Sequence, residues 1–197
     1  MSNERGQVDL SRSVTPWSAG MKARRLVWEI VRPLFFRLTP KWLFWRWRRF
    51  LLVLFGARLG EGVKIHPSAR VLMPWNLVCG RNVVIGADVD VYNFCPITIG
   101  DNAMVSQRTF LCTGSHDPTD PHLPLIFSPI EIGAQAWVAS ECFVGPGRRI
   151  GEGAVIAARS VVTKDMPDWM ICAGHPCKPI KERTLTGESR AGERHYA

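Results

Sequence analysis

One repeat, a hydrophobic residue at every sixth position, constrains this chain more than any other feature. From residue 132 to residue 162 the repeat has no exception: Ile132, Val138, Val144, Ile150, Ile156 and Val162. The residue after each is small, and a second small residue stands four places on, except at Arg148. Helices repeat apolar residues every three to four positions and half-buried strands every second one, so a period of six fits neither. It predicts very short strands joined by tight corners, each turning one β-branched and one small side chain inward.

The same repeat begins much earlier and divides the chain. It starts at Leu59, makes a two-residue step before Ile85 and another before Ile99, and reaches Leu111. It fails over residues 112–131, which contain four prolines and no periodicity. An irregular insertion in a regular coil is a common place for a functional site. We therefore expect a flexible leader (1–20), a helical segment (21–58), a coil domain (59–181) with an inserted loop (112–131), and a flexible tail (182–197).

The positive charge of the chain belongs to one segment. The formal net charge is +8, but residues 21–58 contain ten Lys or Arg and one Glu, whereas residues 59–197 are close to neutral. A coil surface that bound nucleic acid would need its own basic stripe, so we expect no nucleic-acid partner.

The basic segment also contains four of the eight tryptophans. Pro33 and Pro40 predict its division into two helices, over about 21–32 and 41–55, because proline disfavours helix in the residue before it. The longest apolar run is far short of the ~20 residues that span a bilayer. The segment is typical of an interfacial anchor, since tryptophans and bases suit the headgroup region. The alternative is that its helices cover the open first turn of the coil.

The cysteines and the polar N-terminus indicate a reduced compartment. Residues 1–13 lack the apolar run of a signal peptide. Of the six cysteines, Cys95 and Cys142 occupy small positions of the repeat, which predicts packed thiols. Cys172 and Cys177 have no second pair nearby, so a zinc site is not expected.

Three motifs together carry a family resemblance. The hexad run, the loop sequence TGSHD and the closing VVTKD…AGHPCKPI resemble the hexapeptide-repeat acyltransferases, in particular the maltose, galactoside and nodulation-factor O-acetyltransferases. The basic, Trp-rich segment is similar to that of the colanic acid and exopolysaccharide acetyltransferases. The resemblance implies a mainly β fold, a left-handed parallel β-helix with three strands per turn, assembled as a homotrimer. It also implies acetyl-CoA as co-substrate and no metal.

The resemblance also identifies candidate acceptor-side residues. Acetyl transfer to a hydroxyl needs a base for the hydroxyl proton and a donor for the developing oxyanion. His116 matches the family's catalytic position and is the candidate general base, because imidazole exchanges protons near neutral pH. Asn93 matches an acceptor-binding asparagine. Asp117 is a candidate for orienting the imidazole or binding the sugar, with turn formation as the alternative. Trp137 is expected to wall the acetyl or acceptor site, with a subunit contact as the alternative.

For the donor, the resemblance implies a groove between neighbouring subunits that holds the pantetheine arm. Ser140 and Ala158 match positions whose backbone lines that arm, and Ser140 is also a candidate for the oxyanion. Four further residues match positions near the nucleotide end, where lysine complements phosphate as a point charge: Thr163, Lys164, Lys178 and Lys181.

The sequence thus predicts a coenzyme A-dependent O-acetyltransferase of exopolysaccharide or surface-glycan synthesis. It is expected in the cytoplasm, at the inner face of the cytoplasmic membrane, with a saccharide acceptor that is free, nucleotide-linked or lipid-linked. Two alternatives remain open. One is a membrane-surface scaffold with a degenerate site. The other is a zinc carbonic anhydrase of the same fold, which needs three converging histidines where only His116 and His122 are candidates.

Overall fold

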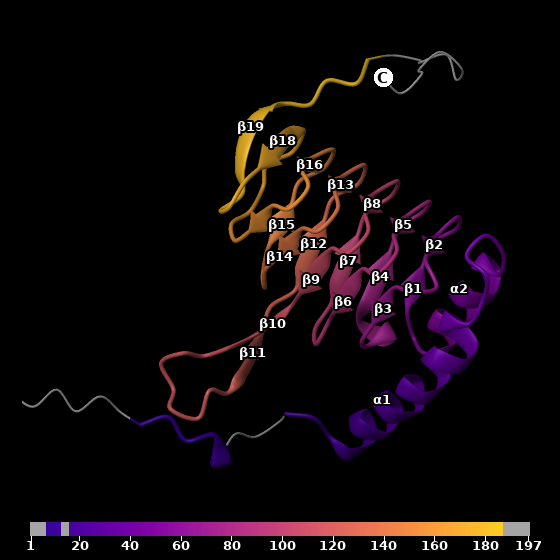
Figure 1. Ribbon diagram of the computed structural model, residues 1–197, viewed down its shortest axis with the longest axis vertical. Helices are drawn as coiled ribbons and strands as arrows, with labels where there is room; N and C mark the ends of the chain where they lie inside the picture. The colour runs from indigo at the N-terminus through magenta and orange to yellow at the C-terminus, as the bar shows by residue number, and fades with distance from the viewer. Residues whose placement is uncertain (1–6, 13–15, 187–197) are drawn as a thin grey trace, which may run out of the picture.

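The computed structural model describes residues 7–12 and 16–186, which form a parallel β-solenoid of about six turns with helices at one end (Figure 1). Successive strands of each turn enter three different sheets. Sheet A contains β1 (Arg58–Leu59), β4 (Leu77–Cys79), β7 (Ile97–Ile99), β12 (Ile130–Ile132) and β15 (Arg149–Ile150). Sheet B contains β2 (Lys64–Ile65), β5 (Val84–Ile85), β8 (Met104–Val105), β13 (Trp137–Val138), β16 (Val155–Ile156), β18 (Met170–Ala173) and the antiparallel β19 (Lys178–Glu182). Sheet C contains β3 (Arg70–Val71), β6 (Asp90–Tyr92), β9 (Phe110–Cys112), β14 (Phe143–Val144) and β17 (Val161–Val162).

The expected inward positions form the core. Every hexad residue from Leu59 to Val162 is at most 9% exposed. The two-residue steps arise in sheet A, where β4 and β7 are three residues long and turn both end residues inward, Leu77 with Cys79 and Ile97 with Ile99. Side chains in a strand alternate between its two faces, so residues two apart both face the core and the period of six resumes after each two-residue step. All six cysteines are free and buried, which confirms the prediction of packed thiols.

The corners explain the small residues that follow the hexad positions. At the corner between sheets A and B the coils approach so closely that a Cβ on Gly60 would lie 2.6 Å from the carbonyl carbon of Gly80. Three residues after a hexad position, the chain adopts left-handed backbone geometry, as at Gln135, Glu141 and Arg159. Arg148, the exception to the small pattern, is only partly buried, and its Nε donates to the Pro146 carbonyl.

The N-terminal helices cover the first turn of the solenoid. They are α1 (Ala19–Val31), the π-helical η2 (Arg32–Arg37) and α2 (Trp45–Leu54), with short 3-10 turns η1 (Leu10–Arg12) and η3 (Pro74–Asn76) elsewhere. The expected division into two helices is confirmed, since α1 ends at Val31 and α2 begins at Trp45, but the chain stays helical beyond Pro33: the helical path widens into η2 there and ends only after Arg37. A π-helix shifts the hydrogen-bond ladder by one residue and so accommodates the missing N–H of proline. Within the described residues, no helix is long and apolar enough to cross a membrane.

Side chains from these helices bond the open edge of the first turn. In later turns, carbonyls such as that of Cys79 accept from the turn before, here from Gly60 N. The first turn has no turn before it, and its three strands use helical donors instead. Arg49 NH2 donates to Leu59 O (3.0 Å), Arg48 Nε to Ile65 O (2.9 Å) and Trp28 Nε1 to Val71 O (2.8 Å). Trp28, Phe36, Leu51 and Leu52 also join the solenoid core. The helical segment therefore covers the first turn of the coil, which is the alternative to a membrane anchor. Arg48 and Arg49 contribute to this covering by their hydrogen bonds.

The inserted loop forms a hairpin, β10 (Gly114–His116) with β11 (Leu125–Phe127), which projects beyond the coil in Figure 1. Part of the expected leader lies against it, because Asp9 N donates to Pro121 O and Trp17 stacks on Phe127 and Phe94. Residues 1–6 and 13–15 of the expected leader lie outside the described residues. In the expected tail, NH1 of Arg183 donates to the Gly153 carbonyl, while residues 187–197 lie outside the described residues.

Candidate active site

A groove of about 420 Å³ follows the corner between sheets B and C. Its lining comes from three successive turns: Ser106, Gln107, Trp137, Ala139, Ser140, Val155, Ala157 and Ala158. Trp137 stands on β13 between β8 and β16, and its Nε1 donates to Ser106 Oγ at 2.9 Å, which holds the half-exposed indole ring as a wall. The structure therefore brings Trp137, which is expected at the acetyl or acceptor site, together with Ser140 and Ala158, which are expected along the pantetheine arm.

Small side chains make this corner a channel for an extended ligand. Ala139 and Ala157 each follow a hexad residue, and Ser106 occupies the same place one turn earlier. With methyl and hydroxymethyl groups at the corners, a ligand can approach the backbone. Sequence reasoning missed Ser106 and Gln107, although the repeat places them one turn before Ala139 and Ser140 and could have identified them.

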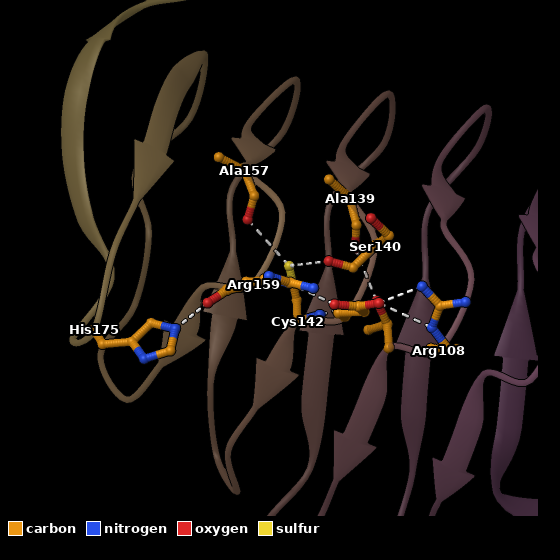
Figure 2. Close-up of polar contacts among 9 residues, drawn as sticks. Arg108, Ala139, Ser140, Cys142, Ala157, Arg159 and His175 are labelled. Atoms are coloured by element: carbon orange, nitrogen blue, oxygen red, sulfur yellow. Dashed lines mark hydrogen bonds and ion pairs between the residues drawn. The ribbon is translucent and has the colours of Figure 1, made fainter.

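A ladder of charges flanks the groove beside Ser140 (Figure 2). Glu141 accepts hydrogen bonds from Arg108 on one side and from Nε of Arg159 at 2.6 Å on the other. The two arginines lower the pKa of the Glu141 carboxyl, through hydrogen bonds first and charge second. His175 Nε2 contacts the Arg159 carbonyl and extends the ladder by a further turn. The ladder ties successive turns together at the corner that forms the groove.

His116 lies on the hairpin, at a different corner of the solenoid. The hairpin connects sheet C to sheet A, whereas the groove lies between sheets B and C. His116 is exposed, and its Nδ1 lies 2.6 Å from the carbonyl oxygen of Leu123. A carbonyl only accepts, so Nδ1 carries the proton and Nε2 of the neutral ring has a free lone pair. This is the tautomer that a general base requires.

Two aspartates shape the hairpin loop. Asp117 Oδ1 accepts from Thr119 N and Thr119 Oγ1, which lowers the pKa of this carboxyl. Asp120 Oδ1 accepts from His122 N, and His122 Nδ1 lies 3.0 Å from the Asp9 carbonyl. Asp117 thus has the geometry of the turn-forming alternative, and no hydrogen bond joins it to the His116 ring among the described residues.

Asn93 is inside the coil and not in a position to meet a sugar. Its side chain is 0% exposed, its Oδ1 accepts from Met73 N at 2.9 Å, and its Nδ2 donates to Met73 O at 2.8 Å. The expectation that Asn93 binds the acceptor is not supported by this position. The side-chain amide instead takes the place of a strand partner for Met73, one turn earlier.

The four residues expected near the nucleotide end divide between two places. Lys178 and Lys181 are exposed on β19, which extends sheet B beyond the groove. Thr163 and Lys164 are exposed after β17, at the corner between sheets C and A where the hairpin also emerges. Apart from the buried Asn93, the expected site residues therefore form two sets, one on sheet B and at its corner with sheet C, and one at the corner between sheets C and A. No cluster of three or more potential metal ligands occurs among the described residues.

Comparison with known proteins assigns this architecture to acetyltransferases. The chain is 41% identical over 180 residues to the colanic acid biosynthesis acetyltransferase WcaF of Escherichia coli strain K12, covering 90% of this chain and 98% of the relative. A maltose O-acetyltransferase from Clostridium difficile 630 superposes with a TM-score of 0.77 at 28% identity, over 85% of this chain and 90% of the other. A galactoside acetyltransferase in complex with coenzyme A gives a TM-score of 0.71 at 27% identity, over 86% of each chain. No family model matches the sequence.

Proposed function

The chain belongs to the hexapeptide-repeat acetyltransferases that include the colanic acid biosynthesis enzymes, and we propose that it acetylates a saccharide hydroxyl with His116 as general base. Acetyl-CoA is the co-substrate. The observation that carries the role of His116 is the bond of its Nδ1 to the Leu123 carbonyl, which leaves Nε2 as the free base. Nε2 takes the proton of the acceptor hydroxyl while its oxygen attacks the thioester carbonyl carbon. The carbon–sulfur bond then breaks, and the thiolate of coenzyme A leaves with the proton from the imidazolium.

The groove beside Trp137 is the proposed donor site. The apolar indole ring of Trp137 and the small side chains of Ala139 and Ala157 leave room for the narrow pantetheine chain. Ser140, at the groove lip, is a candidate donor to the oxyanion that forms during attack. Lys178 and Lys181 lie further along the same sheet, where their charges would complement phosphates.

We propose that the active site is formed between subunits of a homotrimer. The corner between sheets B and C carries Ser140 and Ala158, with Trp137 beside them on β13 of sheet B, and the corner between sheets C and A carries His116, Thr163 and Lys164. The width of a whole sheet separates the two sets within one chain, which supports the proposal that a second copy supplies the base to the groove. A homotrimer with threefold symmetry would contain three equivalent sites of this kind, one between each pair of neighbouring subunits.

The general-base role is tested by comparing His116→Ala with His122→Ala. We expect His116→Ala to lower kcat by ~10²–10⁴, measured as thiol release from acetyl-CoA with a saccharide acceptor, and to leave coenzyme binding unchanged. His122→Ala is the matched control, since His122 contacts the Asp9 carbonyl of the leader. Equal activity of His116→Ala and the wild type would remove His116 from the mechanism. Absence of acetyl transfer by the wild type to any glycan acceptor would favour the scaffold alternative.

The intersubunit arrangement is tested by complementation between two inactive variants. His116→Ala lacks the base, and Ser140→Trp blocks the groove. Trimers formed by random mixing of the two chains contain one intact site per mixed trimer, so about a quarter of wild-type activity returns. Activity that stays at the level of the separate variants, in trimers shown by mass to be mixed, would place both sets of residues in a site within one chain.

We also propose that the helical segment contacts the cytoplasmic membrane surface. Thirteen large apolar side chains between residues 26 and 54 are exposed, among them Leu38 at 74% and Trp42 at 69%. They are additional to the apolar side chains of this segment that are buried against the coil, such as Trp28 and Leu52. Exposed bases such as Lys41 and Arg46 accompany them, and each base near an anionic leaflet contributes about 1 kcal/mol.

Flotation with anionic and neutral vesicles tests the membrane contact. A chain truncated to begin near Leu59 would expose the core that Trp28 and Leu52 cover, so point variants are the better probe. We expect the double variant Leu38→Ser with Trp42→Ser to lose flotation with anionic vesicles, and Ile180→Ser, an exposed apolar residue at the far end of the solenoid, to keep it. Equal flotation of all three chains, or none by the wild type at low salt, would contradict the proposal.

A further inference from the structure

A second cavity, distinct from the donor groove, lies between α1 and the first strand of sheet C. It has a volume of about 380 Å³ and is lined by Arg25, Trp28, Glu29, Arg32, Arg70, Val71 and Leu72. Three guanidinium groups therefore converge on one concave site. Neither the donor groove nor the hairpin uses any of them.

The charges in this cavity are incompletely matched. Arg25 Nε donates to Glu29 Oε1 at 2.9 Å, and Arg70 Nε lies 3.6 Å from Asp90 Oδ1, too far for a good hydrogen bond. Asp90 Oδ1 is buried and has no hydrogen bond among the described residues. The guanidinium group of Arg32 has neither a hydrogen bond nor an ion pair within residues 7–12 and 16–186, although it is partly buried. Burial, followed by the charges of Arg70 and Arg37, lowers the pKa of Arg32, and the nearby Glu29 and Asp90 carboxylates offset this only in part.

This donor arrangement suits phosphate oxygens. Guanidinium groups bind phosphate through paired N–H donors, and a partly buried cluster gains more from an anion than a solvated one. Three arginines around a space of this size can contact more than one phosphoryl group. The excess of arginines over Glu29 and Asp90 leaves net positive charge for the anion to neutralise.

The cavity is also connected to the hairpin that carries His116. Leu72 lines the cavity and belongs to the hydrophobic cluster of Leu72, Met73 and Phe94. Leu125, the cross-strand partner of His116, packs against that cluster. Both α1 and the hairpin lie along the same side of the solenoid in Figure 1. The arginine cavity and the hairpin that carries His116 therefore border the same hydrophobic cluster.

The opposite face of α1 is apolar and exposed. Leu26, Val27 and Ile30 are each more than half exposed, whereas Arg25, Trp28 and Arg32 recur at helical spacing on the side facing the cavity. One helix diameter, about 10 Å, thus separates the cavity from the surface proposed to contact lipid. That is a suitable depth for a phosphate group at the head of a membrane-embedded chain.

We propose that this arginine cavity binds the phosphate or diphosphate group to which the acceptor sugar is joined. The inference rests on the proposed acetyltransferase function and deepens it, because it assigns the acceptor to the class of sugar phosphates or diphosphates. The carrier is a lipid or a nucleoside, and both present the same anionic group to the arginines. The sugar lies toward His116, and the anion is held apart from the reacting hydroxyl.

Direct binding of inorganic pyrophosphate tests the cavity without any acetyl transfer. Arg32→Gln is the informative variant, since its guanidinium group makes no described contact whose loss would disturb the fold. Arg46→Gln is the matched control, with the same change of charge on α2 in a different cavity. By calorimetry at low salt we expect Arg32→Gln to weaken pyrophosphate binding by about tenfold or more and Arg46→Gln to bind as the wild type does. No binding by the wild type, or equal binding by Arg32→Gln and Arg46→Gln, overturns the proposal.

Kinetics with matched acceptors separate this inference from the function on which it rests. The same sugar is offered free, as a nucleoside diphosphate sugar and as a polyprenyl diphosphate sugar. We expect Arg32→Gln to raise KM about tenfold for the diphosphate acceptors at unchanged kcat, and to leave the free sugar unaffected. The acceptor with the lower wild-type KM identifies the carrier. Equal KM changes for free and diphosphate sugars overturn the inference, whereas normal pyrophosphate binding without any acetyl transfer supports the site and contradicts the proposed function.

Discussion

Replacing Arg48 tests whether the helices stabilise the solenoid by bonding its open edge. The Arg48 side chain is 0% exposed and has no carboxylate partner among the described residues. Its Nε donates to Ile65 O at 2.9 Å, its NH1 to Thr39 Oγ1 at 2.8 Å and to Pro40 O at 3.1 Å. The guanidinium also stacks 4.4 Å from the Trp45 ring centre. These bonds connect α2, the preceding turn and the first strand of sheet B.

Arg48→Met is expected to lower the free energy of unfolding because it leaves the Ile65 carbonyl without its hydrogen-bond donor. Methionine fills a similar volume, so the main loss is the hydrogen bond to Ile65, which is 3% exposed and has no preceding turn to replace the donor. A buried unsatisfied acceptor costs about 1–3 kcal/mol. Thr39 and Pro40 lie nearer the surface and can bond water instead. Removing a desolvated charge offsets part of the loss, so we expect a net destabilisation of about 2 kcal/mol.

Thermal unfolding measures this difference directly. A loss of about 2 kcal/mol corresponds to a fall in Tm of about 4–8 °C for a chain of this length. Arg46→Met is the control, because Arg46 is exposed on the same helix and makes no hydrogen bond among the described residues. Protein concentration must be held constant, since assembly also stabilises the folded state. If Arg48→Met melted at or above the temperature of Arg46→Met, the hydrogen bonds at the open edge would not contribute to stability and the reasoning would fail.

Three further predictions follow from the packing of the coil. Gly133→Ala should cost about 1–3 kcal/mol because its Cβ would lie 2.5 Å from a backbone nitrogen of the next turn, whereas Gly20→Ala, with open space around it, should stabilise α1 slightly; urea unfolding compares the two. Asn93→Ala should lower stability by about 1–3 kcal/mol, since the buried Met73 N–H loses its partner whereas the Met73 carbonyl keeps the hydrogen bond from Asn76 N, and unaltered Tm would refute that structural role. Burial raises the pKa of the Cys79 thiol to about 12, so all six buried thiols should resist a thiol reagent at pH 8 until urea unfolds the chain; rapid labelling of the native protein would contradict this.

The sequence alone determined the path of the coil. Whether a side chain such as Val138 or Ile156 faces inward depends only on its position within a two-residue strand. The period of six in the local sequence gives that position. The groove residues Trp137, Ser140 and Ala158 are identified as candidates through the family resemblance, and each occupies a defined place in its own hexad. The inserted loop was equally visible, because a regular repeat makes its own interruption evident.

Only the tertiary structure decided which groups in different turns meet. The family resemblance assigns Asn93 to acceptor binding, yet the stacking of turns places its amide against the Met73 backbone. The arginine excess of the helical segment suggests lipid, yet Arg48 and Arg49 bond carbonyls of the first turn. Likewise, nothing local places Arg32 beside Arg70 in one cavity. The physical reason is that these partners lie many residues apart, so their meeting depends on how turns and helices stack and not on the conformation of either segment.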